Sequence, residues 1–326
     1  MRISIIVPVY ENAAGLAECL RALVPAAGPA AEILVVDDGS TDDTSAAAER
    51  FGVRVLRLER NSGAGAARNH GAREATGDVL LFVDSDVVVA PDTVTRVVTV
   101  FEERPDVAAV FGSYDAAPRA PGLVSQFRNL LHHFVHQHGA PEASTFWAGC
   151  GAIRRVVFEA AGGFDTGRYT RSIEDIELGY RLRDAGHRIL LDRDLRVTHL
   201  KQWTLVSFLR TDVLYRALPW SRLILQRRAR LDHLNLKAEH RLSVALAGLL
   251  CVSLPLAALD PAMLTLAAAA SVGLLLANRK LLAFFARARG FSFAAAAFPL
   301  LFLHYLASGV GSLWARTGHA LARAAG

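Results

Sequence analysis

Short apolar runs rich in β-branched residues alternate with alanine-rich stretches along the N-terminal part of the chain. The runs have the length of buried strands, and the stretches between them have the periodicity of helices. Apolar strands separated by helices are typical of a parallel sheet that is covered on both faces. The pattern therefore predicts an α/β domain with the strands Ile3–Val9, Glu32–Asp37, Val53–Leu58, Asp78–Val83 and Val107–Phe111. The helices expected between them are Gly15–Leu23, Asp42–Arg50, Gly63–Ala75 and Pro91–Phe101.

Polar side chains follow several of these strands at the points where the strands end. Ligands of parallel sheets bind beyond the carboxyl ends of the strands, so these groups are expected to share one rim. The pair of acids around Ser85 suits Mg²⁺ or Mn²⁺, which prefer carboxylate oxygens. An isolated pair of this kind is more often a solvated turn, but the preceding buried strand favours a site. The residues at this rim are Pro8, Tyr10, Glu11, Asp37, Asp38, Asp84, Ser85 and Asp86.

Two of the expected helices begin with residues that also suit ligands. The segment 37–40 follows a strand, so one acid can bind a base or ribose while Ser40 or Asp42 caps the next helix. The glycines of 63–68 resemble a dinucleotide-binding loop, but Arg68 replaces the third glycine and the loop follows the third strand. A nicotinamide cofactor is therefore not expected. Arg68 can instead face a diphosphate at the start of the helix, or the glycines can serve close packing alone.

A second group of candidate residues lies further along the chain. Glu174 and Asp175 open a helical pattern, where acids complement the helix dipole. The small-residue stretch 148–152, which contains Gly149 and Cys150, suggests a pocket nearby, and an acid there can accept a proton from an attacking hydroxyl. His199 follows an apolar run and is either structural or a ligand of metal or diphosphate. The histidines between 132 and 138 are expected on a surface or acceptor-loop helix, and zinc is the less favoured interpretation.

The composition changes beyond residue 200. Residues 201–241 mix basic with large apolar and aromatic side chains, as in helices that lie in a membrane interface. The apolar segments 242–259, 262–277 and 291–314 then predict about three transmembrane helices. The alternative is a set of buried helices in a soluble domain. Basic residues flank the first two spans and place those flanks in the cytoplasm, and the N-terminal run is too short for a signal peptide.

The charge is distributed unevenly. The whole chain has a net charge of +5, but residues 1–200 hold 27 acidic against 21 basic residues. The positive charge lies beside the most apolar segments, where it suits a membrane surface. A nucleic-acid partner is not expected, because such proteins place their basic patch on the folded module. The three cysteines are widely spaced, which excludes a disulfide framework and a cysteine-based zinc site.

Several blocks of residues 1–200 resemble family-2 glycosyltransferases with the GT-A fold, a Rossmann-like mixed sheet that binds nucleotide-diphospho-sugars. The resemblance implies that Pro8, Tyr10, Glu11 and Asp38 hold the donor nucleoside. The Gln-x-x-Arg-Trp block of processive synthases is absent from the sequence, so polymerisation is not expected. The matching blocks are Val7–Asn12, Val35–Asp42, Ala67–Gly71, Phe82–Asp86, Gly162–Asp165 and Glu174–Leu182.

The same resemblance implies the roles of the remaining residues. Asp84 and Asp86 engage the donor and a divalent metal, with His199 as a second metal ligand. Asp175 is the base of an inverting transfer. Arg68 and Ser85 are expected at the donor, and Gly149, Cys150 and Glu174 at the acceptor pocket.

The expected protein is a glycosyltransferase that moves a sugar from a UDP- or GDP-sugar to a lipid or lipid-linked acceptor. Its expected parts are a catalytic domain (1–200), interface helices (201–241) and a transmembrane region (242–326). We expect a multi-pass protein of the inner membrane with its catalytic domain in the cytoplasm, and a homo-oligomer is possible. The alternatives are a non-catalytic nucleotide-sugar sensor or scaffold and a polyprenyl-phosphate glycosyl synthase; a lipid-linked-sugar transporter is disfavoured by the scarcity of charge within the spans.

Overall fold

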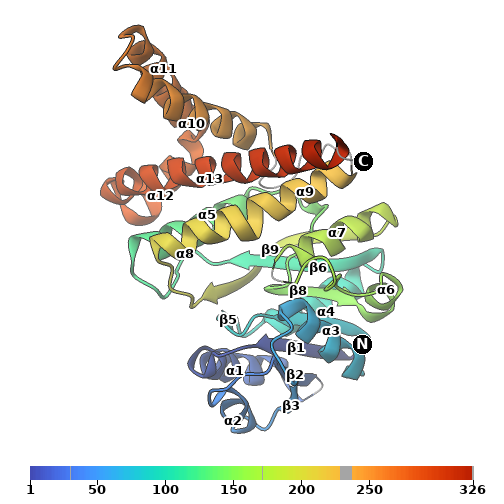
Figure 1. Cartoon of the computed structure of the whole chain (residues 1–326). Coiled ribbons are helices and arrows are strands. Elements are labelled where there is room, and N and C mark those ends of the chain that lie inside the picture. The colour runs from blue at the N-terminus through green and yellow to red at the C-terminus, as the bar shows by residue number, and fades with distance from the viewer. Residues whose placement is uncertain (30, 171, 228–236, 325–326) are drawn as a thin grey trace. The chain divides into compact units, whose positions relative to one another are not determined.

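The computed structural model describes residues 1–29, 31–170, 172–227 and 237–324 (Figure 1). The chain divides into two compact units. Unit 1 consists of Met1–Ala120 and His136–Lys201, and unit 2 consists of Pro121–Val135 and Gln202–Gly326. Unit 1 contains a mixed α/β sheet, as predicted, and the regular elements among the described residues of unit 2 are all helices.

The sheet of unit 1 has nine strands, in the order β3-β2-β1-β4-β8-β6-β9-β5, with β7 pairing with β9. The first four strands in this order are parallel, as predicted. Beyond β4 the sheet is mixed, as the resemblance to the GT-A fold implies, because β8 inserts antiparallel to both β4 and β6. The strands are β1 Ile3–Val9, β2 Glu32–Asp37, β3 Arg54–Arg57, β4 Val79–Val83, β5 Val87–Val89, β6 Val107–Tyr114, β7 Glu142–Ala143, β8 Cys150–Arg154 and β9 Arg188–His199.

The helices of unit 1 cover this sheet, whose central strands are apolar on both faces. Every residue of β1 and β4 is buried, which explains their unbroken apolar sequences. Leu16, Leu20 and Leu23 of α1 pack into the main core cluster, and the Asn12 side chain caps this helix by accepting a hydrogen bond from the Gly15 amide at 3.3 Å. The helices are α1 Ala13–Ala27, α2 Thr44–Glu49, α3 Ala64–Glu74, α4 Thr93–Glu103, α6 Arg155–Ala160 and α7 Glu174–Asp184.

Helix α5, Leu123–Gln137, spans the boundary between the units. The expectation of a surface helix is wrong for His136, which is buried and has its Nδ1 2.9 Å from the carbonyl oxygen of Gly112. Its ring also packs edge-on against Phe111 and Trp147. His136 therefore belongs to the core of unit 1.

Unit 2 begins with α8 Leu205–Arg210, the π-helix η1 Thr211–Ala217 and α9 Leu218–Arg227. Residues 228–236 of the predicted interface segment lie outside the described residues. Helices α10 (Ala238–Leu256) and α13 (Phe291–Ala324) are long and apolar enough to cross a membrane. The predicted middle span is α11 (Ala262–Ala277), which qualifies only together with α12 (Arg279–Arg289), from which it is bent by 64°. The described part of unit 2 thus offers two or three spans by length and composition.

Candidate active site

The acidic pair Asp84 and Asp86 lies in the short connection between β4 and β5. The Asp84 amide donates a hydrogen bond to the carbonyl oxygen of Gly149 at 3.0 Å, which ties this connection to the start of β8. An Asp86 oxygen lies 3.6 Å from Nε2 of His199, the last residue of β9. The structure therefore places a carboxylate and an imidazole side by side at the carboxyl end of β4.

The Asp86–His199 pair fits part of a metal site. Octahedral Mg²⁺ or Mn²⁺ has bond lengths of about 2.1 Å, so neighbouring ligands lie roughly 3 Å apart. Burial acts to raise the pKa of Asp86, but the hydrogen bond and charge of His199 and the charge of Lys201 outweigh it and lower that pKa. The carboxylate is thus ionised at neutral pH. Among the described residues, no group of three or more His, Cys, Asp or Glu side chains could hold a metal ion, so a cation at this pair would need further ligands from outside these side chains.

Arg68 of α3 joins the acidic pair to the start of α7. Its Nη2 lies 2.6 Å from an Asp84 oxygen, and its Nη1 lies 2.8 Å from a Glu174 oxygen. The guanidinium is buried and lies 5.6 Å from the centre of the Phe164 ring. These two carboxylates raise the pKa of Arg68 against the effect of burial, so the group is a permanent cation. Arg68 therefore holds residues from distant parts of the sequence in one place.

Glu174 and Asp175 form the first turn of α7, which follows Ile173 in the left-handed conformation (φ 58°). Burial and the charge of Asp175 raise the pKa of Glu174 to about 7, although Arg68 acts to lower it. Asp175 is half-buried, and its Oδ2 accepts a hydrogen bond from the Ala148 amide at 3.2 Å. Glu174 is thus paired with Arg68, while Asp175 contacts the segment before β8.

The predicted pocket stretch is mostly core. Cys150 is fully buried in β8 beside Val83 of β4, and burial raises the pKa of its thiol to about 12. The prediction that its side chain lines a pocket is therefore not supported. Gly149 has a steric role, since a Cβ atom there would lie 2.4 Å from the Trp147 ring.

The expected nucleoside residues lie at the ends of β1 and β2. Pro8 is buried within β1, whereas the Tyr10 side chain is 46% exposed. Glu11 has a left-handed backbone (φ 49°), and its side chain accepts hydrogen bonds from the amide and hydroxyl of Thr41, both at 2.8 Å. The Glu11 amide donates to the Ser40 hydroxyl at 2.9 Å. A non-glycine residue in this conformation carries strain, which is frequent at ligand sites.

Asp38 uses both carboxylate oxygens within the protein. They accept hydrogen bonds from the amides of Ser62, at 2.8 Å, and Gly63, at 2.7 Å. Burial raises the pKa of Asp38 despite these bonds. Gly63 itself has φ 91°, and a Cβ there would lie 2.1 Å from the Thr170 carbonyl oxygen. Asp38 therefore fixes the loop that leads into α3 and Arg68.

The predicted residues lie in two groups, which hydrogen bonds and ion pairs connect in part. The set around Arg68 contains Asp84 and Glu174, with Asp86 and His199 beside it. The set around Glu11 and Asp38 approaches it through the Asn12 side chain, which lies 3.5 Å from the Ser85 hydroxyl. No direct contact joins Asp38 to Asp86 or Asp175 among the hydrogen bonds and ion pairs of the described residues.

The sequence reasoning missed two aromatic residues beside the site. Tyr114, the last residue of β6, stacks on the His199 ring with centroids 4.1 Å apart and an interplanar angle of 12°. Trp147 packs edge-on against Tyr114 at 5.0 Å. The only signal for Tyr114 was its position at a strand end, and Trp147 was marked only by its nearness to Gly149.

Comparison with known proteins identifies the family. Residues 4–162 match the model of Glycosyl transferase family 2. An uncharacterized glycosyltransferase of Haemophilus influenzae is 31% identical over 192 residues, which cover 55% of this chain and 61% of that protein. The glucosyl-dolichyl phosphate glucuronosyltransferase of Haloferax volcanii is 25% identical over 217 residues, covering 61% of this chain and 69% of that protein. Residues 4–162 are therefore a glycosyl transferase family 2 domain, as the sequence motifs predicted.

The fold is also confirmed. A mannosyltransferase of Pyrobaculum calidifontis, solved in complex with GDP-Man and Mn²⁺, matches with a TM-score of 0.61 at 23% identity. The match covers 96% of this chain and 87% of that structure. Identity at this level establishes the shared GT-A architecture alone. The chain spans less than two thirds of the length of the Haemophilus relative.

Proposed function

We propose that this protein transfers a sugar from a UDP- or GDP-sugar to a hydroxyl of a lipid or lipid-linked acceptor, with inversion at the anomeric carbon. The observation that carries the proposal is the convergence of acids from β4 and α7 on Arg68, next to the Asp86–His199 pair. This arrangement provides ligands for a cation and a diphosphate on one side and a candidate base, Asp175, on the other. The GDP-Man and Mn²⁺ in the complex of the Pyrobaculum mannosyltransferase support the donor class and the metal.

The donor is proposed to lie along the ends of β1, β2 and β4. Glu11 and Asp38 shape the nucleoside end, with Pro8 and the exposed ring of Tyr10 beside them. Asp86 and His199 are proposed to hold Mg²⁺ or Mn²⁺, which supplies a Lewis acid for the departing diphosphate when bound. Arg68 adds a permanent positive charge near the same phosphates, and Asp84 is held by it at 2.6 Å.

The proposed transfer is a single displacement, in which one bond forms at the anomeric carbon as another breaks. The acceptor hydroxyl oxygen attacks the anomeric carbon from the face opposite the diphosphate and forms the new glycosidic bond. The bond between that carbon and the diphosphate oxygen breaks, and its electron pair leaves with the nucleoside diphosphate. Asp175 takes the hydroxyl proton. Glu174 is less suited to this step because it is buried and paired with Arg68 at 2.8 Å.

The apolar helices of unit 2 support the proposed acceptor class. Two or three of them have the length and composition of membrane spans. The glucosyl-dolichyl phosphate in the name of the Haloferax relative supports an acceptor that is anchored in lipid. We propose that the catalytic unit works on the cytoplasmic side, as the basic residues around 279–289 favour. A polyprenyl-phosphate acceptor is the second candidate on the same grounds.

The experiment is a transfer assay with the full chain in membranes. A panel of labelled UDP- and GDP-sugars is offered with total lipid extract and Mn²⁺, and products are identified by mass. We expect one donor to label a lipid, with loss of the product in Asp175→Asn and retention in the matched surface variant Asp106→Asn. Donor binding without transfer or hydrolysis for every sugar in the panel would indicate a sensor instead.

A further inference from the structure

Strand β9 contains a wide bulge before it reaches His199. Phe111 of β6 pairs with Leu191, but Ser113 pairs with Arg196. The difference in residue number between paired residues therefore rises from 80 to 83. Gly112 therefore faces residues 192–195, which carry three extra positions on β9. A Cβ at Gly112 would lie 1.9 Å from the Leu195 carbonyl oxygen, so the bulge requires glycine at that point.

Because the number of extra residues is odd, the side chains of β9 after the bulge face the opposite side of the sheet from the one they would otherwise face. Side chains alternate between the two faces of a strand, so three additional residues move every later side chain to the other face. The core cluster shows this reversal: Leu190 packs against it before the bulge, whereas Leu195 and Val197 belong to it afterwards. His199 shares the face of Val197, because they are two residues apart. Without the bulge, His199 would point away from that face.

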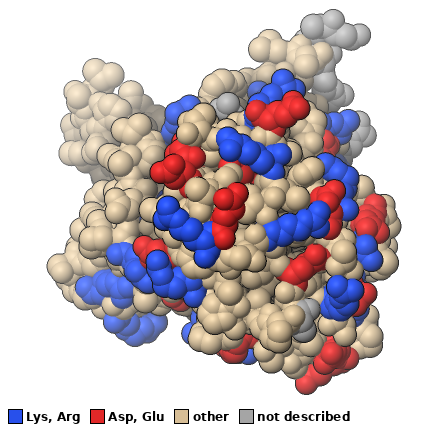
Figure 2. Space-filling view, turned by 90° about the horizontal axis from the view of Figure 1, so that it is seen from below, with Lys and Arg blue, Asp and Glu red and all other residues tan. Residues whose placement is uncertain are grey.

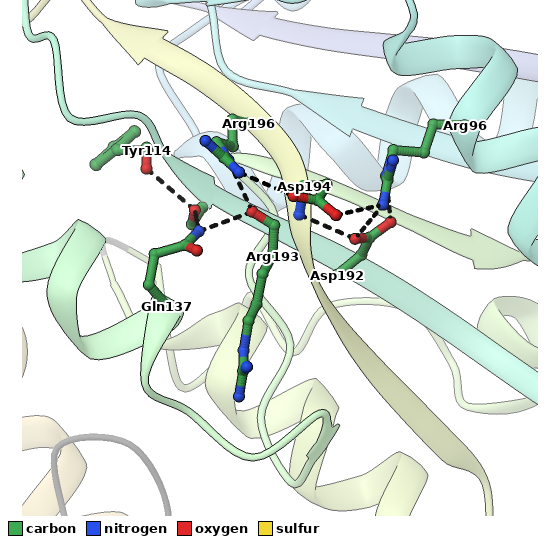
Figure 3. A network of polar contacts seen from close by, with 8 residues as sticks. Arg96, Tyr114, Gln137, Asp192, Arg193, Asp194 and Arg196 are labelled. Carbon is green, nitrogen blue, oxygen red and sulfur yellow. Dashed lines mark hydrogen bonds and ion pairs between the residues drawn. The ribbon is translucent and has the colours of Figure 1, made fainter.

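The bulge is braced by side chains from two helices, as Figure 3 shows. Arg96 of α4 binds Asp192 through Nε at 2.6 Å and Nη2 at 2.9 Å, and its Nη2 also lies 3.1 Å from Asp194. Gln137 at the end of α5 donates to the Arg193 carbonyl oxygen at 2.8 Å and to the Ser113 hydroxyl at 2.9 Å. The brace therefore holds both the bulge and the strand opposite it.

We propose that Arg96 and Gln137 are positioning residues that set the face and register of β9, and thereby aim His199 at Asp86. This role rests on the metal role proposed above for that pair. Bulges beside active sites frequently serve to redirect a side chain. Beyond the bulge, the pairing of His199 with Val87 and its stacking on Tyr114 complete its placement. Neither Arg96 nor Gln137 is proposed to touch the substrate or the metal.

The test measures Mn²⁺ affinity by titration calorimetry on the full chain in detergent, with UDP and with GDP present. Arg96→Met is expected to weaken Mn²⁺ binding by about 10-fold, the lower end of the range for residues that orient a ligand. Arg188→Met is the matched control, since Arg188 lies on β9 before the bulge and pairs with Asp106 and Glu142. It should leave Mn²⁺ affinity unchanged. Gln137→Leu, which leaves the Arg96 ion pairs intact, gives a second measurement if Arg96→Met does not fold.

A double-mutant cycle with His199→Ala distinguishes failure of the positioning role from failure of the metal role. We expect His199→Ala to weaken Mn²⁺ binding and to abolish the further effect of Arg96→Met. An Arg96→Met effect that persists in the His199→Ala background would show that the brace acts through another group, and the positioning role would be wrong. Unchanged Mn²⁺ affinity in Arg96→Met and Gln137→Leu, with a weakened His199→Ala, would also overturn it. Unchanged affinity in His199→Ala itself would instead overturn the metal role.

Discussion

Two buried arginines, one in each unit, have similar surroundings and opposite consequences. Arg68 in unit 1 pairs with Asp84 and Glu174 and lies over the Phe164 ring. Arg128 in unit 2 pairs with Asp212 at 2.6 Å and lies over the rings of Trp203 and Phe208. The difference is in their partners: the Asp84 side chain is 29% exposed, whereas that of Asp212 is 2% exposed and also contacts His304 at 2.6 Å.

This difference in exposure distinguishes a site from a structural centre. The Asp84 and Asp86 side chains are each 29% exposed, so both stay accessible to the proposed donor and metal. Asp212 is enclosed by Arg128 and His304, whose charges lower its pKa although burial acts to raise it. Its carboxylate sits in the π-helix η1 and links α5 to α13 within unit 2. Figure 2 shows acidic and basic side chains interspersed over much of one face of the molecule.

The largest expected effect is on sugar transfer, in the partly exposed group of acids around Arg68 and the start of α7. Asp175→Asn should lower sugar transfer by about 10³-fold, because it removes the proposed proton acceptor while keeping its shape. Donor binding, measured by calorimetry, should stay near the wild-type value. Retained turnover would remove Asp175 from the base role, and a larger loss in Glu174→Gln would give that role to Glu174.

Substitutions in the buried cluster of Arg128, Asp212 and His304 should lower the stability of the protein. Asp212→Ala leaves Arg128 buried and unpaired with a carboxylate, which should cost about 3 kcal/mol. The measurement is the unfolding midpoint in detergent, with donor affinity measured in parallel. A stable variant with weakened donor binding would place Asp212 in the site and contradict the comparison.

A smaller effect is expected for the metal ligand. Asp86→Asn should weaken Mn²⁺ binding by roughly 10- to 100-fold, as loss of charge at an oxygen ligand implies. Asp92→Asn is the matched control, because Asp92 is exposed at the start of α4 and makes no capping hydrogen bond. Equal Mn²⁺ affinities in the two variants would argue against a cation at Asp86.

The smallest effect concerns pH. The pKa of Glu174 rises from its ordinary value of 4.5 to about 7, so the folded chain binds this proton more tightly than the unfolded chain. Its contribution to stability is full below pH 4.5 and is lost as the pH rises toward 7. Glu174→Gln should flatten this fall, because the amide has no proton to lose in this pH range. If the free energy of unfolding varied with pH in the same way for variant and wild type, the raised pKa of Glu174 would be contradicted.

Local pattern was sufficient for the first part of the fold. The strand ranges Ile3–Val9 and Glu32–Asp37 were predicted to the residue, because their apolar runs are continuous and fully or largely buried. Strand β9 was recognised only near its end, since the charged residues 192–194 of the bulge interrupt its apolar pattern. The antiparallel β8 was also missed, because pairing between distant segments leaves no local period.

The candidate site was predictable as a set of residues and not as a geometry. Position at a strand end or at the start of a helix marked Asp84, Asp86 and the pair of Glu174 and Asp175 as candidates, and the family resemblance singled out Asp175 within that pair. Arg68 joins Asp84 to Glu174, which lies 106 residues further along the chain than Arg68, and only the assembled fold brings the first turn of α7 to α3. The placement of His199 likewise depends on Tyr114 and on the bulge, which only the assembled sheet defines.

The most direct measurement is a structure of the full chain with Mn²⁺ and a non-transferable donor analogue. We predict Mn²⁺ bound by Asp86 and His199 together with the diphosphate, and the anomeric carbon exposed toward Asp175. Density for the nucleotide or the metal away from Asp86, or an anomeric carbon facing away from Asp175, would contradict the proposed transfer.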